Sequence, residues 1–181
     1  MSRIDTHFKC GHTVGIHLWG TDEEVEIQRQ AMERACLCPE CLINKVGWLP
    51  SVPFETAMEK AGELKLPCLK GSFKQIKWAF SLRGRIFAMP IKMLWAIFEQ
   101  ESLALRQIPQ YSESLNVFDI DFDYQPRDNL VLVWKGFLLE ARQIDDSTWW
   151  IAREDHCARE LANAALREYA DAYTINHTNN G

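Results

Sequence analysis

Two closely spaced pairs of metal-binding residue types constrain this chain more than any other feature: Cys10-Gly11-His12 and Cys38-Pro39-Glu40-Cys41. The two-residue gap of the second pair lets both thiolates reach one ion, and a tetrahedral zinc site then needs two further ligands. Cys10 and His12 are the natural second pair, because a glycine between them can take a positive φ and turn both side chains inward. The sequence therefore predicts a structural Zn²⁺ site with the ligands Cys10, His12, Cys38 and Cys41.

The alternative for Cys38 and Cys41 is a redox dithiol. A redox Cys-x-x-Cys normally lies at a helix N-terminus, where the helix dipole lowers the thiol pKa. Here the pair follows a predicted helix, which favours metal binding. Four protein ligands leave no open coordination position, so the ion would be structural rather than catalytic. The candidate substitute ligands are His7, His17 and Cys36.

A small zinc module is expected over residues 1–44. We predict a β-hairpin over 7–19 and a helix over about 22–36, which opens with a capping box because Thr21 is followed three residues later by Glu24. A segment of this size has no adequate core of its own, so zinc would supply its folding energy.

The remaining segments predict a mainly helical domain over 45–175, with a flexible tail at 176–181. Helices are expected at about 55–64, from Ser72 onward, at 91–108 and at 155–173. Residues 117–124 alternate apolar and acidic and predict a strand, whereas 130–134 fit either a strand or a helix. The predicted fold class is thus α+β, mainly α, with a β insertion near 117–134.

Composition narrows the class of protein and the cellular compartment expected for this chain. The 181 residues are 47% hydrophobic and 25% charged, as in soluble globular proteins, and no apolar run approaches the roughly 18 residues of a membrane span. The first residues form no secretory signal, so we expect a cytoplasmic protein without membrane contact. In that compartment the six cysteines are thiols or ligands, and Cys68 and Cys157 are expected to be buried thiols.

Positive charge is concentrated in the middle of the chain. Residues 60–92 hold eight Lys or Arg and one Glu, whereas the rest holds 12 Lys or Arg and 24 Asp or Glu. The imbalance indicates either an anionic partner or docking of the chain's own acidic parts. The candidate nucleic-acid-binding residues are Lys70, Lys74, Lys77, Arg83 and Arg85.

The aromatic residues of this basic segment allow two interpretations. Phe73, Ile76, Ala79 and Phe80 recur at helical spacing, which predicts a core stripe. An exposed aromatic such as Trp78 would instead stack on a base.

Asp119, Asp121 and Asp123 share one face of the predicted strand. Such a stripe is most often the solvated face of an edge strand. It could also hold Mg²⁺ in a nucleic-acid-processing enzyme or face a basic partner. No lysine or histidine base accompanies the stripe, so the sequence leans away from an enzyme.

Three segments in order resemble a group of small uncharacterised proteins of phages, plasmids and other bacterial mobile elements. These are the cysteine-bearing hairpin, charged helix and Cys-Pro-x-Cys of 7–41, the Leu-x-Gly-Ser-x-Lys-Gln-Ile-x-Trp-Ala motif within 69–83, and the Trp-Ile-x-x-Arg element within 146–154. The resemblance implies a bound metal and a bacterial or phage origin. In that group the Trp-Ile-x-x-Arg element is helical, whereas residues 145–147 here could equally form a turn before a strand.

These observations favour a zinc-stabilised, non-enzymatic accessory protein that binds a macromolecule, with nucleic acid favoured over a host protein. No small-molecule cofactor is expected.

Overall fold

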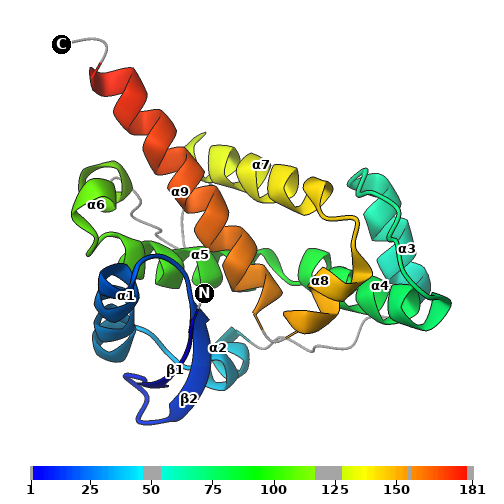
Figure 1. The fold of residues 1–181 in the computed structure, drawn as a ribbon, viewed down its shortest axis with the longest axis horizontal. Coiled ribbons are helices and arrows are strands. Elements are labelled where there is room, and N and C mark those ends of the chain that lie inside the picture. Colours follow the sequence, from blue (N-terminus) through cyan, green and yellow to red (C-terminus); the bar gives the residue numbers. More distant parts are fainter. Residues whose placement is uncertain (1, 47–53, 117–127, 155, 179–181) are drawn as a thin grey trace.

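The computed structural model describes residues 2–46, 54–116, 128–154 and 156–178. In this part of the chain a two-stranded antiparallel hairpin is followed by nine helices (Figure 1), so the predicted α+β, mainly α class is confirmed. No helix among the described residues is long and apolar enough to cross a membrane. The elements are β1 (Ser2–His7), β2 (Thr13–Leu18), α1 (Asp22–Ala35), α2 (Pro39–Val46), α3 (Phe54–Glu63), α4 (Phe73–Phe87), α5 (Ile91–Leu105), α6 (Pro109–Asn116), α7 (Asp128–Gln143), α8 (Ser147–Ala152) and α9 (Cys157–Thr178).

The hairpin begins earlier than the predicted residue 7, because β1 pairs along its whole length from Ser2 opposite Leu18 to His7 opposite Thr13. The predicted capping box of α1 is confirmed. The Thr21 hydroxyl accepts from the Glu24 N–H at 3.3 Å, and the Glu24 carboxylate accepts from the Thr21 N–H at 2.8 Å. Both bonds satisfy N–H groups near the start of the helix, which fixes the start of α1.

The helical body is built around α9, which runs across α5 and lies beside α7 (Figure 1). Gly136 of α7 faces α9, and a Cβ there would lie 3.4 Å from the Ala165 Cβ, in van der Waals contact. The largest fully buried side chains of this core include Phe98, Phe137 and Trp150.

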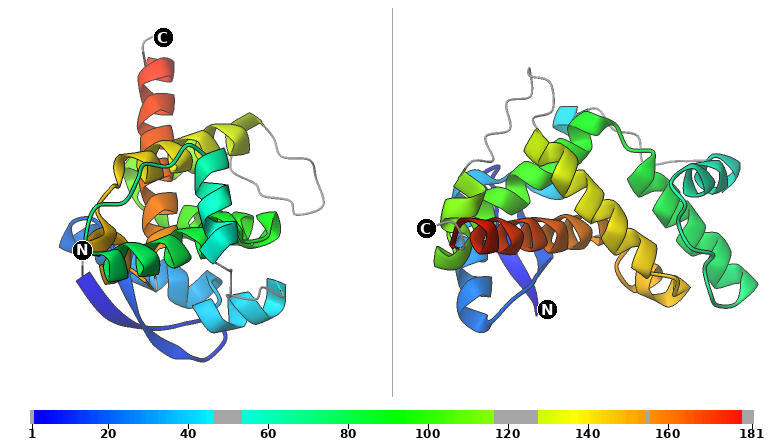
Figure 2. Two further views of the ribbon diagram at one scale, coloured as in Figure 1. Left: turned by 90° about the vertical axis from the view of Figure 1, so that its right-hand side faces the viewer. Right: turned by 90° about the horizontal axis from the view of Figure 1, so that it is seen from above.

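Helices α3 and α4 pack against each other at the end of the molecule opposite the hairpin (Figures 1 and 2). The Ser72 hydroxyl accepts from the Gln75 N–H at 3.4 Å, and the Gln75 side chain accepts from the Ser72 N–H at 2.9 Å, as the predicted second capping box requires. Just before α4, Gly71 has φ +140°, and a Cβ there would lie 2.1 Å from the Ser147 Oγ. A glycine at this position lets the chain pass closely beneath α8.

Two expectations for the C-terminal half are corrected. Residues 128–143 form α7 rather than part of a β insertion, because Val133, Phe137 and Ala141 are all fully buried on one helix face. Residues 147–152 form α8, which Asp146 caps by accepting from the Thr148 N–H at 2.9 Å, so no hairpin turn occurs there. The predicted strand at 117–124 lies outside the described residues.

Candidate metal centre

The hairpin turn presents Cys10 and His12 together. The Gly11 N–H donates to the Phe8 carbonyl at 2.8 Å, and the Phe8 N–H donates to the His12 carbonyl at 2.9 Å. These bonds close a tight loop in which Gly11 has φ +83°, a conformation that favours glycine. The backbone thus adopts the positive φ that the sequence predicted.

The second pair of ligands lies where α1 ends and α2 begins. Cys36 has an extended backbone that terminates α1, and its carbonyl accepts from the Lys9 N–H at 3.2 Å. This bond ties the turn of the hairpin to the end of α1. Cys38 immediately precedes α2, and Cys41 lies in the first turn of that helix.

The two pairs converge on one point. The His12 Nδ1 lies 3.5 Å from the Cys38 Sγ and 3.3 Å from the Cys41 Sγ, and the Cys38 N–H donates to the Cys10 Sγ at 3.3 Å. All four ligand atoms lie within 4.8 Å of one another. Cys10, His12, Cys38 and Cys41 could therefore hold a metal ion.

The close packing of the cysteine thiols in the cluster shifts their pKa values. Backbone hydrogen bonds from Cys38 and His12 lower the pKa of Cys10 to about 6. The neighbouring Cys38 and Cys10 side chains, together with burial, raise the pKa of Cys41 to about 12. One thiolate thus forms readily while a second is opposed by its neighbours, and a bound cation would remove that opposition.

The Cys38–Cys41 pair lies between two helices. It follows α1, as predicted, but α2 begins at Pro39, so the pair is also at a helix N-terminus. That position alone does not distinguish a dithiol from a metal site. The convergence of Cys10 and His12 on the same point favours a metal site, because a redox dithiol requires neither residue.

The three substitute ligands lie outside the cluster of four. The His7 Nδ1 is 3.1 Å from the Thr13 Oγ1, and the Cys36 thiol donates to the Gln100 carbonyl at 3.8 Å. His17 stacks on His156, with 3.9 Å between ring centroids.

The basic segment divides into residues bound by the protein itself and residues left on its surface. Arg83 is fully buried, donates to the Pro67 carbonyl at 2.8 Å and cannot contact a phosphate. Lys70 and Arg85 form ion pairs with Asp145 at 2.5 Å and Glu154 at 2.8 Å. Docking of the chain's own acidic groups thus accounts for these two cations. Lys74 and Lys77 are exposed and form no ion pair within the described residues.

The aromatic residues of α4 divide differently from the prediction. Ala79 is fully buried and Ile76 and Phe80 pack against the core, as expected. Phe73 is instead 83% exposed and Trp78 is 48% exposed. The core expectation for Phe73 is therefore wrong, because no described element covers this side chain at the start of α4.

The remaining candidates are settled in part. Asp119, Asp121 and Asp123 lie outside the described residues. Cys157 is buried as predicted, but Cys68 is exposed.

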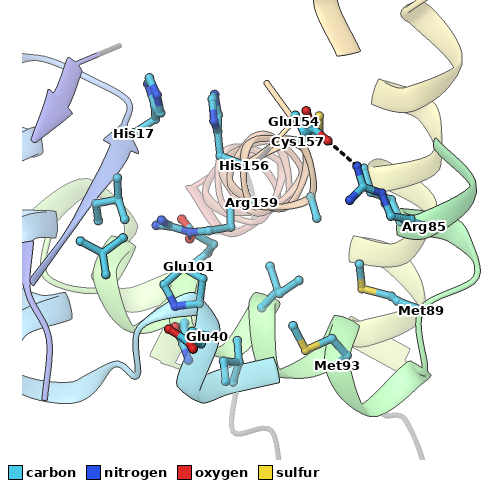
Figure 3. A pocket seen from close by; sticks show the side chains of 18 of the residues that line it. His17, Glu40, Arg85, Met89, Met93, Glu101, Glu154, His156, Cys157 and Arg159 are labelled. Atoms are coloured by element: carbon cyan, nitrogen blue, oxygen red, sulfur yellow. Dashed lines mark hydrogen bonds and ion pairs between the residues drawn. The ribbon is translucent and has the colours of Figure 1, made fainter. Parts of the chain in front are cut away.

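A cavity of about 720 Å³, which no sequence signal predicted, lies between the hairpin and the helices α2, α4, α5, α8 and α9. His156, which the sequence left without a role, lines it (Figure 3). No periodicity or motif signals this site, because its residues come from separate elements. No family model, curated protein or solved structure matches the chain.

Proposed function

We propose that this chain is a zinc-stabilised, non-enzymatic accessory protein of a bacterium or one of its mobile elements, and that it binds single-stranded nucleic acid through α4. In this proposal zinc stabilises the fold, and the exposed face of α4 binds the nucleic acid. The two assignments rest on different residues and are tested separately.

The donor set of the metal centre supports zinc. Three cysteines and one histidine form a Cys₃His set, which zinc prefers in closed structural sites. Zinc–sulfur and zinc–nitrogen bonds of about 2.3 and 2.0–2.1 Å place tetrahedral ligand atoms roughly 3.6–3.8 Å apart. The Cys38 Sγ–His12 Nδ1 distance of 3.5 Å is close to this value, so little movement would admit the ion. The backbone N–H groups that donate to Cys10 and Cys38 would orient these ligands.

The observation that carries the nucleic-acid proposal is the exposed face of α4, formed by Phe73, Lys74, Lys77 and Trp78. At 3.6 residues per turn, these four side chains span roughly 140° of the helix surface, with the two lysines between the two aromatic residues. The opposite side carries the buried Ala79 and Leu82. Cations and aromatic rings therefore share one solvent-facing surface.

A single strand fits this surface better than a duplex. Lysines contact phosphates in either form, but a flat aromatic ring can stack only on a base that has left its own stack. An 83% exposed phenylalanine has little to contribute to folding, whereas a stacking platform requires such exposure.

A filter-binding titration at several salt concentrations tests the proposal. Lys74→Gln with Lys77→Gln should make the slope of log affinity against log salt shallower by roughly one to two units. The variant makes fewer phosphate contacts, so fewer counterions are released when it binds. The matched control is Lys45→Gln with Lys135→Gln, two exposed lysines on α2 and α7. It should leave the slope nearly unchanged. No binding of any single strand at low salt would disprove the function.

A further inference from the structure

The cavity between the hairpin and the helical body has the size of a ligand site. Its volume of about 720 Å³ lies within the roughly 300–1,000 Å³ of small-molecule pockets. It contains neither the four metal ligands nor the exposed face of α4. The cavity is therefore a separate site, and its ligand can be tested apart from both proposals above.

One end of the cavity carries an unsatisfied polar group. His156 is only 7% exposed, and its buried Nε2 has no hydrogen-bond partner among the described residues. Buried polar atoms are nearly always paired, so an orphan that lines a cavity indicates a missing partner. In Figure 3 the His156 ring stands beside that of His17, above Arg159.

Three arginines, Arg153, Arg159 and Arg3, lie near His156. Burial, followed by His17 and these arginines, lowers the pKa of His156 to about 4. The first turn of the 22-residue helix α9 also lines the cavity, and a helix N-terminus carries partial positive charge.

Carboxylates neutralise two of these three arginines. Arg159 pairs with Glu101 at 2.5 Å and Arg153 pairs with Glu160 at 2.6 Å, whereas Arg3 forms no ion pair within the described residues. Of the other acidic groups in the lining, Glu154 is paired with Arg85 at 2.8 Å, and Glu40 is exposed and belongs to α2 rather than to the histidine end. An anionic group beside His156 would therefore meet the charge of Arg3 and the N-terminal end of α9.

One wall of the cavity is lined by aliphatic and thioether side chains. They come from the facing surfaces of α4 and α5 and the segment that joins them: Leu82, Ile86, Met89, Met93 and Ile97. Met89 and Met93 lie across the cavity from His17 (Figure 3). Methionine side chains adapt to irregular apolar ligands.

We propose that this cavity binds an anionic amphiphile, with a carboxylate or phosphate head beside His156 and the first turn of α9 and an apolar chain along Met89 and Met93. Both head groups share the required charge and hydrogen-bond acceptors. The chain would replace water against the apolar wall, and each buried methylene should raise affinity roughly fourfold.

Isothermal titration below the micellar concentration tests the site on the intact, metal-loaded protein. Dodecanoate or dodecyl phosphate should bind, and whichever binds more tightly identifies the head group. Decanoate should bind roughly 15-fold more weakly than dodecanoate. Equal affinity for dodecyltrimethylammonium, or no binding of either anion, would overturn the proposal.

Two variants locate the binding. Ala152 is exposed and lines the cavity, so Ala152→Trp should fill space and lower dodecanoate affinity at least tenfold, whereas Leu132→Trp on α7 should not. Arg3→Gln should weaken the anion several-fold, and Arg34→Gln on α1 serves as its control. If Ala152→Trp does not fold, the dodecanoate affinity of Arg3→Gln tests the location of the site. Unchanged affinity in the folded cavity variants would place the amphiphile elsewhere and overturn the proposal.

Discussion

His17 of β2 stacks on His156 at the start of α9, with 3.9 Å between the ring centroids and 21° between the ring planes. The Trp19 ring lies 6.1 Å from His156. The hairpin that carries two of the metal ligands is thereby packed against the last helix of the chain. Metal binding at one end of the sequence and helix packing at the other are physically connected.

This contact predicts loss of stability in acid. Burial and the neighbouring groups, His17, Arg153, Arg159 and Arg3, lower the pKa of His156 from 6.5 to about 4. Between these values the unfolded chain binds a proton that the folded chain does not, so folding weakens as pH falls from about 6.5 to about 4. The loss in the free energy of unfolding between neutral pH and about pH 4 is on the order of 2–3 kcal/mol.

Thermal melts of wild type and His156→Phe across this pH range measure the effect. Phenylalanine can keep the stacking but cannot titrate, so the melting temperature of the variant should fall less steeply. Loss of metal from the cysteines in acid occurs in both proteins and cancels in the comparison. Parallel curves would show that His156 does not titrate in this range.

Removing a metal ligand should unfold the zinc module. Cys38→Ser and Cys41→Ser should each reduce zinc from about one equivalent per chain to near zero and lower the soluble yield, because a closed site contributes folding free energy directly. Elemental analysis of protein purified without added metal measures the stoichiometry. Cys68→Ser, at an exposed cysteine outside the cluster, should keep the full equivalent. Fully folded metal-free wild type would contradict the assignment.

Local signals in the sequence predicted local structure well. Capping residues place the starts of α1 and α4, and the turn at Gly11 has the backbone conformation that the ligand spacing required. The four proposed ligands meet because one short turn and one helix end hold them. Each of these features depends on a few adjacent residues, so the sequence is sufficient to infer them.

Contacts between distant elements could not be inferred in this way. Arg83 looked like a phosphate ligand, but its guanidinium lies 5.5 Å from the Trp150 ring, which only the packing of α8 on α4 brings near. Phe73 matched the spacing of core residues, yet nothing among the described elements covers it. Residues 130–134 fitted the hydrophobic period of a strand as well as that of a helix, and they form a helix because α7 packs against α9.

Helices α5 and α9 are also held together by a buried ion pair. The Glu101 carboxylate is fully buried and accepts from Arg159 at 2.5 Å and from Asn163 at 3.1 Å. Glu101→Leu would leave Arg159 without its partner, so we expect a loss of about 3–5 kcal/mol in the free energy of unfolding. Glu26→Gln, which breaks the more exposed pair with Arg29, should cost under about 1 kcal/mol. Urea denaturation compares the two, and similar losses would contradict the buried role of Glu101.

Arg83 should tolerate an apolar replacement. Within the described part of the chain its Nε and Nη2 have no hydrogen-bond partner, and burial lowers its pKa to about 10, so the charge is poorly compensated. Arg83→Met keeps much of the packing volume and removes the buried charge, so the free energy of unfolding should change by less than about 1.5 kcal/mol. Arg83→Ala leaves a cavity and should cost about 2–5 kcal/mol. The methionine variant should also keep the wild-type salt slope, since a buried residue contacts no phosphate.

Phe73 separates stacking on a base from attraction to phosphate. Phe73→Ala should change the melting temperature little, because an exposed side chain contributes within about 0.5 kcal/mol of stability. Loss of the Phe73 ring should weaken single-strand binding by about 1–3 kcal/mol, roughly 5- to 150-fold. The salt slope should stay unchanged, because stacking on a base releases no counterions. Phe73→Trp should retain affinity, and Leu132→Ala, at a 52% exposed leucine on α7, should have no effect. If Phe73→Ala binds as tightly as wild type while the Lys74 and Lys77 changes weaken binding, α4 contacts phosphates alone and the preference for single strands is wrong.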